Sequence, residues 1–240
     1  MSIFLLSDDL SFPPPELAEE NGLLAVGGDL REERIIKAYS MGIFPWYSED
    51  SPILWWSPDP RLVLFPSELN VSRSLRQLIH KGIFSVTVNT AFERVIQCCA
   101  EKRRKDKSGT WITADMMHAY TRLHYAGYAH SVEAWHDGEL AGGLYGIIVG
   151  KIFFGESMFS NMSNASKVAF ATFVEDLRLR HFKLIDCQVR TEHLVSLGAR
   201  EISRSDFQQI LRQACAEKMT QSQNDHLIGP EPRPRKEGIK

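Results

Sequence analysis

Three polar residues interrupt apolar stretches of the chain, and their types suit proton transfer. Asp186 and Gln188 lie in residues 183–189 (KLIDCQV), where strand alternation would place both side chains on one face. Glu156 follows an apolar run and a glycine in KIFFGES. An ionised carboxylate without partners in a buried strand costs several kcal/mol, so each one is hydrogen-bonded, exposed at a sheet edge or functional. We expect the three side chains to meet in one cleft.

Trp111 combines with a basic run that precedes it. The segment GTWIT follows KRRKDK, which we interpret as a loop and which contributes Lys102, Arg103, Arg104 and Lys105. Cations for phosphate and a flat ring for a base are what binding of single-stranded nucleic acid requires. A solvated charged loop is the alternative for KRRKDK, and it stays open.

Apolar residues around two glycine-containing segments predict a pocket. GGLYG and FFGES carry glycines inside expected strands, which marks either close approach of another group or a β-bulge. Adaptable apolar side chains surround these segments and the helix that follows them. The expected lining residues are Leu144, Phe153, Phe154, Met158, Phe170 and Phe173.

Several classes of function are disfavoured. The sequence contains no GxxxxGK[ST], no GxGxxG after a strand and no GxSxG, which argues against nucleotide hydrolysis, dinucleotide chemistry and serine hydrolysis. No CxxC, HxxxH or HExxH occurs, so we expect no metal site. The longest apolar stretch, residues 140–149, is too short for a membrane span, and the N-terminus does not resemble a signal peptide. We therefore expect a cytoplasmic protein.

The elements that would position these residues fall into two regions. Residues 1–62 are dense in Pro, Gly and Trp and predict a small N-terminal domain, with a helix from Asp29 as N-cap to Ser40 and Glu32 completing a capping box. Residues 63–219 alternate between strands and helices, and residues 220–240 form a polar tail that we expect to be disordered. The chain has 240 residues and a net charge of −2, so any nucleic-acid site must be a local basic patch.

The second region predicts a mixed α+β sheet with flanking helices. Residues 84–89, 151–156 and 183–189 are expected strands, and residues 130–136 and 139–149 form a hairpin through Asp137-Gly138. Expected helices run over residues 90–101, from a Thr113 cap, from Asn164, and from Ser205 to about Met219. These elements would bring the polar and apolar candidates to one sheet.

A long series of motifs closely resembles the bacterial leucyl/phenylalanyl-tRNA–protein transferases. They span about residues 20–203 and comprise NGLLAVGGDL, GIFPWYS, ILWWSPDPR, GTWIT, HSVEAW, GGLYG, FFGESMFS with NASK, LIDCQV and HLVSLGA. The resemblance implies a small N-terminal domain packed on a domain of the GNAT acyltransferase fold. It also implies transfer of leucine or phenylalanine, with methionine as a further candidate, from aminoacyl-tRNA to proteins that begin with Arg or Lys. The product would carry an N-terminal degradation signal.

The same resemblance assigns binding roles. Trp46 and Trp111 match positions implicated in holding the 3′-terminal adenosine of the tRNA, and Phe153, Met158 and Phe173 match the pocket for the aminoacyl side chain. Leu144 stands where a methionine is expected, a swap that conserves volume and should cost under about 1.5 kcal/mol. No ATP, coenzyme A or other cofactor is implied, because the aminoacyl ester is already activated. We expect the protein to be a monomer.

Glu156, Asp186 and Gln188 match the polar positions proposed to handle the nucleophile and the ester. Our mechanistic hypothesis is that Asp186 orients and polarises Gln188, whose carbonyl oxygen accepts a proton from the incoming α-amine. Glu156 would position the aminoacyl amino group or the acceptor.

Two alternatives of other classes stay open. A coenzyme-A-dependent N-acetyltransferase would share the fold, but it requires a glycine-rich pyrophosphate turn, which NMSNASK does not provide. A non-catalytic module that binds tRNA or protein N-termini would need neither Asp186 nor Gln188.

Overall fold

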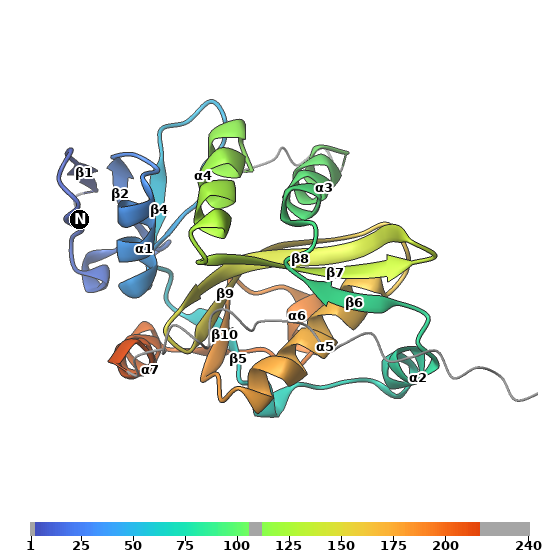
Figure 1. The fold of residues 1–240 in the computed structure, drawn as a ribbon. Helices are drawn as coiled ribbons and strands as arrows, with labels where there is room; N and C mark the ends of the chain where they lie inside the picture. The colour runs from blue at the N-terminus through green and yellow to red at the C-terminus, as the bar shows by residue number, and fades with distance from the viewer. Residues whose placement is uncertain (1–2, 106–111, 217–240) are drawn as a thin grey trace, which may run out of the picture.

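The computed structural model describes the backbone of residues 3–105 and 112–216, with side chains for residues 3–101 and 112–216. A seven-stranded sheet in the order β11-β5-β10-β9-β8-β7-β6 forms its centre (Figure 1). Its strands are β5 (Arg61–Leu64), β6 (Ser85–Val88), β7 (Ala129–His136), β8 (Glu139–Val149), β9 (Ile152–Ser160), β10 (Leu184–Gln188) and β11 (Arg200–Ile202). β9 and β10 run parallel while the other neighbouring pairs are antiparallel, which confirms the predicted mixed α+β class.

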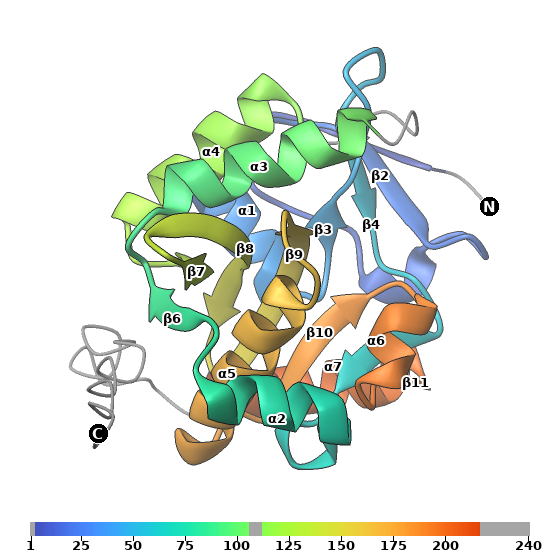
Figure 2. The ribbon, with the colours of Figure 1, turned by 90° about the vertical axis from the view of Figure 1, so that its right-hand side faces the viewer.

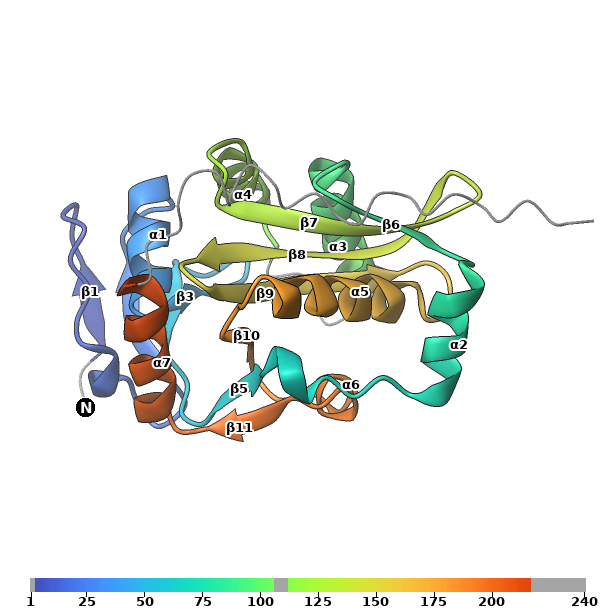
Figure 3. The same cartoon turned by 60° about the horizontal axis from the view of Figure 1, so that its bottom comes forward.

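Helices cover both faces of this sheet. Figure 3 shows α3 (Phe92–Lys105) and α4 (Ala114–Tyr125) on one side and α5 (Ala165–Leu179) on the other. The remaining elements of this region are η2 (Pro66–Glu68), α2 (Arg73–Lys81), α6 (Glu192–Ser196) and α7 (Arg204–Ala216). α5 is buried along most of its length, because its apolar side chains pack onto β7 and β8.

The N-terminal segment forms a second, smaller sheet in the order β1-β2-β4-β3. It contains β1 (Phe4–Leu6), β2 (Leu23–Gly27), β3 (Phe44–Pro45), β4 (Leu54–Trp56), a short η1 (Pro15–Leu17) and α1 (Glu32–Ser40). Figure 1 and Figure 2 show α1 of this segment beside α4, and the buried Tyr39 and Trp55 belong to the same apolar cluster as Phe92 and Tyr120. The two regions thus share one core, and a domain boundary near residue 62 stays a prediction.

Strong local signals gave correct elements. The Asp137-Gly138 turn joins β7 to β8 with both residues at positive φ, as a two-residue hairpin requires. Thr113 caps α4 by accepting a hydrogen bond from the Met116 amide at 3.2 Å. Both predictions depended on contacts within a few residues.

Three local predictions were wrong. α3 continues to Lys105, so residues 102–105 are helical and not a loop. Asp29 does not cap α1, because it accepts from Arg31 and Arg34 while Arg31 occupies the N-cap position without a side-chain cap. The last helix is capped by Ser203, whose hydroxyl accepts from the Asp206 amide at 3.0 Å, and not by Ser205. Trp111 and the tail from residue 220 lie outside the described residues.

Candidate functional site

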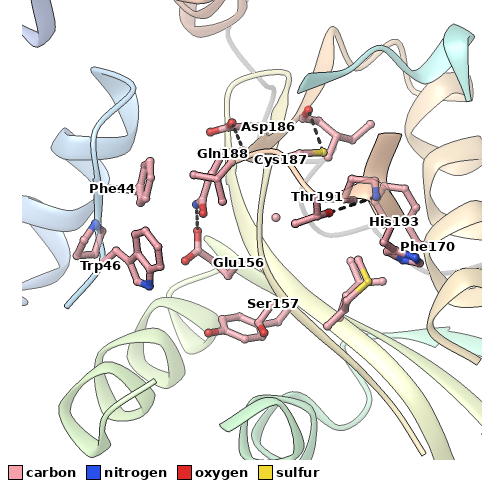
Figure 4. A pocket seen from close by; sticks show the side chains of 18 residues that line it. Phe44, Trp46, Glu156, Ser157, Phe170, Asp186, Cys187, Gln188, Thr191 and His193 are labelled. Atoms are coloured by element: carbon pink, nitrogen blue, oxygen red, sulfur yellow. Dashed lines mark hydrogen bonds between the residues drawn. The ribbon is translucent and has the colours of Figure 1, made fainter. Parts of the chain in front are cut away.

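A cavity of about 380 Å³ opens where the N-terminal segment meets the middle of the large sheet. Figure 4 shows Phe44 and Trp46 on one side, Glu156 and Gln188 in the centre, and Phe170, Thr191 and His193 on the other side. Its remaining lining residues are Pro45, Leu144, Tyr145, Gly155, Ser157, Met158, Ile185, Asp186, Cys187, Val189 and Leu194. Most of this lining is apolar.

Two β-bulges aim the central polar residues. In the β8–β9 pairing, Tyr145 pairs with Ser157 and Gly146 with Gly155, so Glu156 is the extra residue of the bulge. A Cβ at position 146 would lie 2.1 Å from the Phe154 carbonyl oxygen, which explains the glycine there. Bulges re-aim a side chain beside many active sites.

The second bulge lies in β10 and turns Gln188. Asp186 pairs with Val63 and Gln188 with Leu62, and Gln188 adopts a left-handed φ of 62°. This geometry breaks the simple strand alternation that predicts Asp186 and Gln188 on one face. The Gln188 amide nitrogen instead donates to Glu156 Oε1 at 3.0 Å.

Glu156 is buried among hydroxyl groups from two helices. The Tyr39 hydroxyl donates to Oε1 at 2.7 Å and the Tyr120 hydroxyl lies 3.0 Å from Oε2. The two tyrosine oxygens are 2.6 Å apart. Burial raises the pKa of Glu156 to about 7, with a further raising effect of Asp186, although the hydrogen bonds from both tyrosines and Gln188 lower it. Burial also holds the pKa values of Tyr39 and Tyr120 well above the usual value.

Asp186 has a different environment. Its carboxylate accepts two hydrogen bonds from Arg61, at 2.8 and 2.6 Å, and both side chains are almost completely buried. The Arg61 guanidinium also lies 4.7 Å from the ring centroids of Phe44 and Phe207. Asp186 Oδ1 accepts from the Gln188 backbone amide at 2.9 Å. The described hydrogen bonds therefore join Asp186 to the Gln188 backbone and not to its side-chain amide, so the predicted side-chain relay is absent from them.

The predicted apolar residues divide into two groups. Leu144, Met158 and Phe170 line the cavity. Phe153, Phe154 and Phe173 are not among its lining residues, so these three predictions were wrong; all three are fully buried, and Phe153 and Phe173 pack edge-to-face at 4.9 Å. The structure instead adds Ile185 and Leu194 among the apolar lining residues, along with Cys187.

Of the residues predicted to contact tRNA, Trp46 is described at the site. It lines the cavity and 41% of its surface is exposed. Its carbonyl oxygen accepts from Trp56 Nε1 at 2.6 Å, and the two rings lie 5.9 Å apart. Trp111 and the side chains of residues 102–105 lie outside the described part of the chain.

Sequence reasoning missed Arg61, Tyr39 and Tyr120. Arg61 in SPDPR and the tyrosines in KAYS and HAYT have no local pattern that separates them from ordinary surface or core residues. They come to the site only through contacts 125, 117 and 36 positions apart in sequence. The one usable signal was that each buried carboxylate needs hydrogen-bond donors, which indicates that arginine or tyrosine partners must lie elsewhere in the chain.

Neither a membrane-spanning helix nor a metal-binding cluster is found among the described residues. In residues 3–105 and 112–216 no helix is both long enough and apolar enough to span a bilayer. The same residues contain no group of three His, Cys, Asp or Glu side chains that could hold a metal ion.

Comparisons with known proteins agree on one family. Residues 63–212 match the model of the leucyl/phenylalanyl-tRNA protein transferase family, and residues 28–59 match that of its N-terminal domain. The chain is 59% identical over 211 residues to the leucyl/phenylalanyl-tRNA–protein transferase of Syntrophobacter fumaroxidans, covering 88% of this chain and 90% of that protein. It is 57% identical over 213 residues to that of Desulfatibacillum aliphaticivorans, covering 89% and 91%.

Likeness to solved structures is more remote. A GCN5-related N-acetyltransferase from Kribbella flavida shares 11% identity and a TM-score of 0.35, over 69% of this chain and 58% of that chain. This likeness is too low to refine the architecture described above.

Proposed function

The chain belongs to the leucyl/phenylalanyl-tRNA–protein transferase family, and from this premise we propose that it moves leucine or phenylalanine from tRNA to proteins beginning with Arg or Lys. One observation carries the proposal at the site. Gln188 is held at its backbone by Asp186 and at its amide nitrogen by Glu156, while within the described residues its Oε1 has no partner and the residue lines the cavity. That oxygen is available to accept an N–H bond from an attacking amine.

The cavity has separate surfaces for the parts of an aminoacyl-adenosine. Leu144, Met158 and Phe170 offer an apolar wall for a leucine or phenylalanine side chain. Across the cavity from Phe170, the exposed ring of Trp46 offers a stacking face for the terminal base, worth about 1–3 kcal/mol. Glu156 and Gln188 lie between these surfaces, where the ester would be placed.

Direct attack of the amine on the ester fits this arrangement. Burial raises the pKa of the Cys187 thiol, which disfavours a thiolate nucleophile and hence a covalent aminoacyl-enzyme. Holding amine and ester together can lower the barrier by up to about 7–11 kcal/mol. Gln188 would orient the amine, with Arg61 and Asp186 fixing the Gln188 backbone.

A transfer assay without ATP or coenzyme A tests the proposal. The protein is incubated with radiolabelled Leu-tRNA and an Arg-initiated peptide, with neither ATP nor coenzyme A, and labelled peptide is expected. The same peptide with an acetylated N-terminus is the control and should stay unlabelled. No label on the free peptide would reject the transferase, and acetylation of it by acetyl-coenzyme A would support the acetyltransferase alternative.

The apolar wall predicts which donors are used. We expect leucine and phenylalanine to transfer well, and β-branched isoleucine and valine to transfer poorly because their branch crowds the cavity near Met158. Equal single-turnover rates from Leu-tRNA and Ile-tRNA would contradict this assignment.

The basic residues of α3 predict an electrostatic contribution. Neutralising Lys102, Arg103, Arg104 and Lys105 should weaken all donor tRNAs alike and reduce the dependence of binding on salt. Effects that differ among tRNAs would indicate base recognition instead of phosphate contact.

A further inference from the structure

Glu156, Tyr39 and Tyr120 form a closed ring of three oxygen-to-oxygen contacts. Tyr39 lies 2.6 Å from Tyr120 and 2.7 Å from Glu156 Oε1, and Tyr120 lies 3.0 Å from Oε2. All three distances are those of O–H···O hydrogen bonds, which range over about 2.5–3.0 Å. Within the described residues neither hydroxyl has another partner.

A count of protons favours the neutral form of this ring over the ionised form. Each tyrosine hydroxyl supplies one proton, and an ionised carboxylate supplies none. With Glu156 ionised, two protons would serve three contacts, and one pair of oxygens would face each other without a proton. With Glu156 protonated, Oε2 donates to Tyr120, Tyr120 donates to Tyr39, and Tyr39 donates to Oε1. Every contact is then a hydrogen bond, and Oε1 keeps a lone pair for the Gln188 amide.

The surroundings of Glu156 agree with a neutral acid. Among the described residues no arginine, lysine or histidine pairs with it, whereas neighbouring Asp186 is matched by Arg61. Burial raises its pKa to about 7, so both protonation states are accessible near neutral pH. The titratable and charged groups around it are Tyr39 from α1, Tyr120 from α4, Tyr145 from β8, Asp186 from β10 with Arg61 from β5, and His193 across the cavity.

We infer that Glu156 rests as a carboxylic acid and donates its proton to the ribose oxygen that leaves when the aminoacyl ester is cleaved. The inference depends on the transferase function proposed above. Tyr39 and Tyr120 are positioning residues, because they act on the reaction through Glu156.

The proton balance closes within one turnover. The lone pair of the neutral acceptor amine forms a C–N bond to the ester carbonyl carbon, and the C–O bond to the terminal ribose breaks with its electron pair on oxygen. The Glu156 proton goes to that oxygen. The attacking nitrogen loses one proton as the amide forms, and this proton returns to the Glu156 carboxylate. No cofactor or further reactant is needed.

Glu156→Gln is the main test, because a carboxamide can keep the ring through its N–H but cannot give up a proton. In single-turnover transfer of leucine, the parent rate should rise as the acceptor α-amine loses its proton and should fall at higher pH as Glu156, with a pKa of about 7, ionises. In Glu156→Gln that alkaline fall should vanish and the maximum rate should drop by about 10²-fold or more. A Gln variant as fast as the parent, with or without the alkaline fall, would overturn proton donation.

A matched pair of donors separates proton donation from positioning. Leu-tRNA ending in 2′-deoxyadenosine has a poorer leaving oxygen than Leu-tRNA ending in 2′-deoxy-2′-fluoroadenosine, since fluorine makes the neighbouring hydroxyl more acidic. If Glu156 protonates that oxygen, the decrease in single-turnover rate caused by Glu156→Gln should be several-fold smaller with the fluorinated donor. An equal loss with both donors would assign Glu156 a positioning role and reject the inference.

Tyr39→Phe and Tyr120→Phe test the ring. Each removes a hydroxyl that donates to Glu156 once the carboxyl is ionised, so the alkaline fall should move to higher pH, while kcat drops about tenfold at constant KM. Tyr125→Phe is the matched control, because the exposed Tyr125 hydroxyl donates to Glu93 at 2.8 Å away from the cavity. If the transfer rates of Tyr39→Phe and Tyr120→Phe fell at the same pH as that of the parent, the two tyrosines would not be positioning residues for Glu156.

The protonation state can also be measured without substrate. In protein carrying ¹³C-carboxyl glutamate, the resonance missing from Glu156→Gln should titrate near pH 7. A Glu156 carboxylate already ionised at pH 5.5 would overturn the inference even if leucine transfer is observed. Failure of the parent to transfer leucine at any pH would instead reject the proposed function.

Discussion

Asp186 and Glu156 lie on neighbouring strands of one sheet and line one cavity, yet the fold treats their carboxyl groups in opposite ways. Asp186 on β10 meets the guanidinium of Arg61 with two hydrogen bonds. Glu156 on β9 meets two phenols and an amide, and no cation among the described residues. Both side chains are more than 90% buried, so the difference comes from the partners and not from depth.

This contrast shows how a site can hold one fixed charge and one movable proton. A buried carboxylate with a bidentate arginine stays ionised, because the pair compensates the loss of hydration. A buried carboxyl with only neutral donors is ionised less readily, and its pKa rises towards the working pH. Gln188 connects the two, since Asp186 holds its backbone and Glu156 holds its side chain.

Removing the arginine of the buried Arg61–Asp186 ion pair should have the greatest effect on stability. Arg61→Met leaves Asp186 buried without a counter-ion and should lower the free energy of unfolding by about 3–5 kcal/mol. Urea denaturation at neutral pH measures this loss. A loss below about 1 kcal/mol would show that Asp186 is not an ionised group held by Arg61.

The uncharged environment of Glu156 predicts that the stability of the protein depends on pH. The folded-state pKa of Glu156 is raised from 4.5 to about 7, so its contribution to stability is fully present below about pH 4.5 and is lost as the pH rises through 7. The difference in unfolding free energy between the parent and Glu156→Gln should therefore change by about 3 kcal/mol between pH 4 and pH 8, to the disadvantage of the parent. Parallel stability curves for the two proteins would contradict the raised pKa.

Gln188, which contacts both carboxyl groups, allows a test of the backbone strain between them. Its φ of 62° is unfavourable for any residue with a Cβ, so Gln188→Gly should be more stable than Gln188→Ala by about 0.5–1 kcal/mol. Both variants lose the side-chain amide and should transfer leucine slowly. Thermal unfolding gives the order of stability, and an alanine variant as stable as the glycine variant would indicate that the backbone relaxes.

The smallest effect is expected for an exposed pair of the same type as Arg61–Asp186. Arg200 also binds a carboxylate with two hydrogen bonds, to Glu68, but about half of its side chain is exposed. Arg200→Met should cost no more than about 1 kcal/mol, and added salt should reduce that cost. A cost similar to that of Arg61→Met would mean that burial does not explain the contrast.

Local patterns predicted the β7–β8 hairpin, the Thr113 cap and the mixed sheet, because turns, caps and strand alternation depend on neighbouring residues. They failed where a tertiary contact competes. Asp29 could have capped α1, but it binds Arg34, whose side chain is completely buried. Residues 102–105 continue α3 although their charge suggested a loop.

The candidate site divides in the same way. Its polar residues Glu156, Asp186 and Gln188 stood out because charged and amide groups are costly in apolar strands. Leu144, Met158 and Phe170 followed from their apolar character and line the cavity. The bulges at Glu156 and Gln188 were not predicted, since a bulge is defined by the register of two paired strands.

Residue types and their local order were enough to predict the family, the α+β class and the side chains with catalytic potential. The role of each carboxyl group follows from contacts between distant parts of the chain. Arg61, Tyr39 and Tyr120 reach the site from distant positions in the chain, and the charge of a buried acid depends on the partners that surround it. Residue type alone contains no information about those partners, so the fixed charge at Asp186 and the movable proton at Glu156 are properties of the fold.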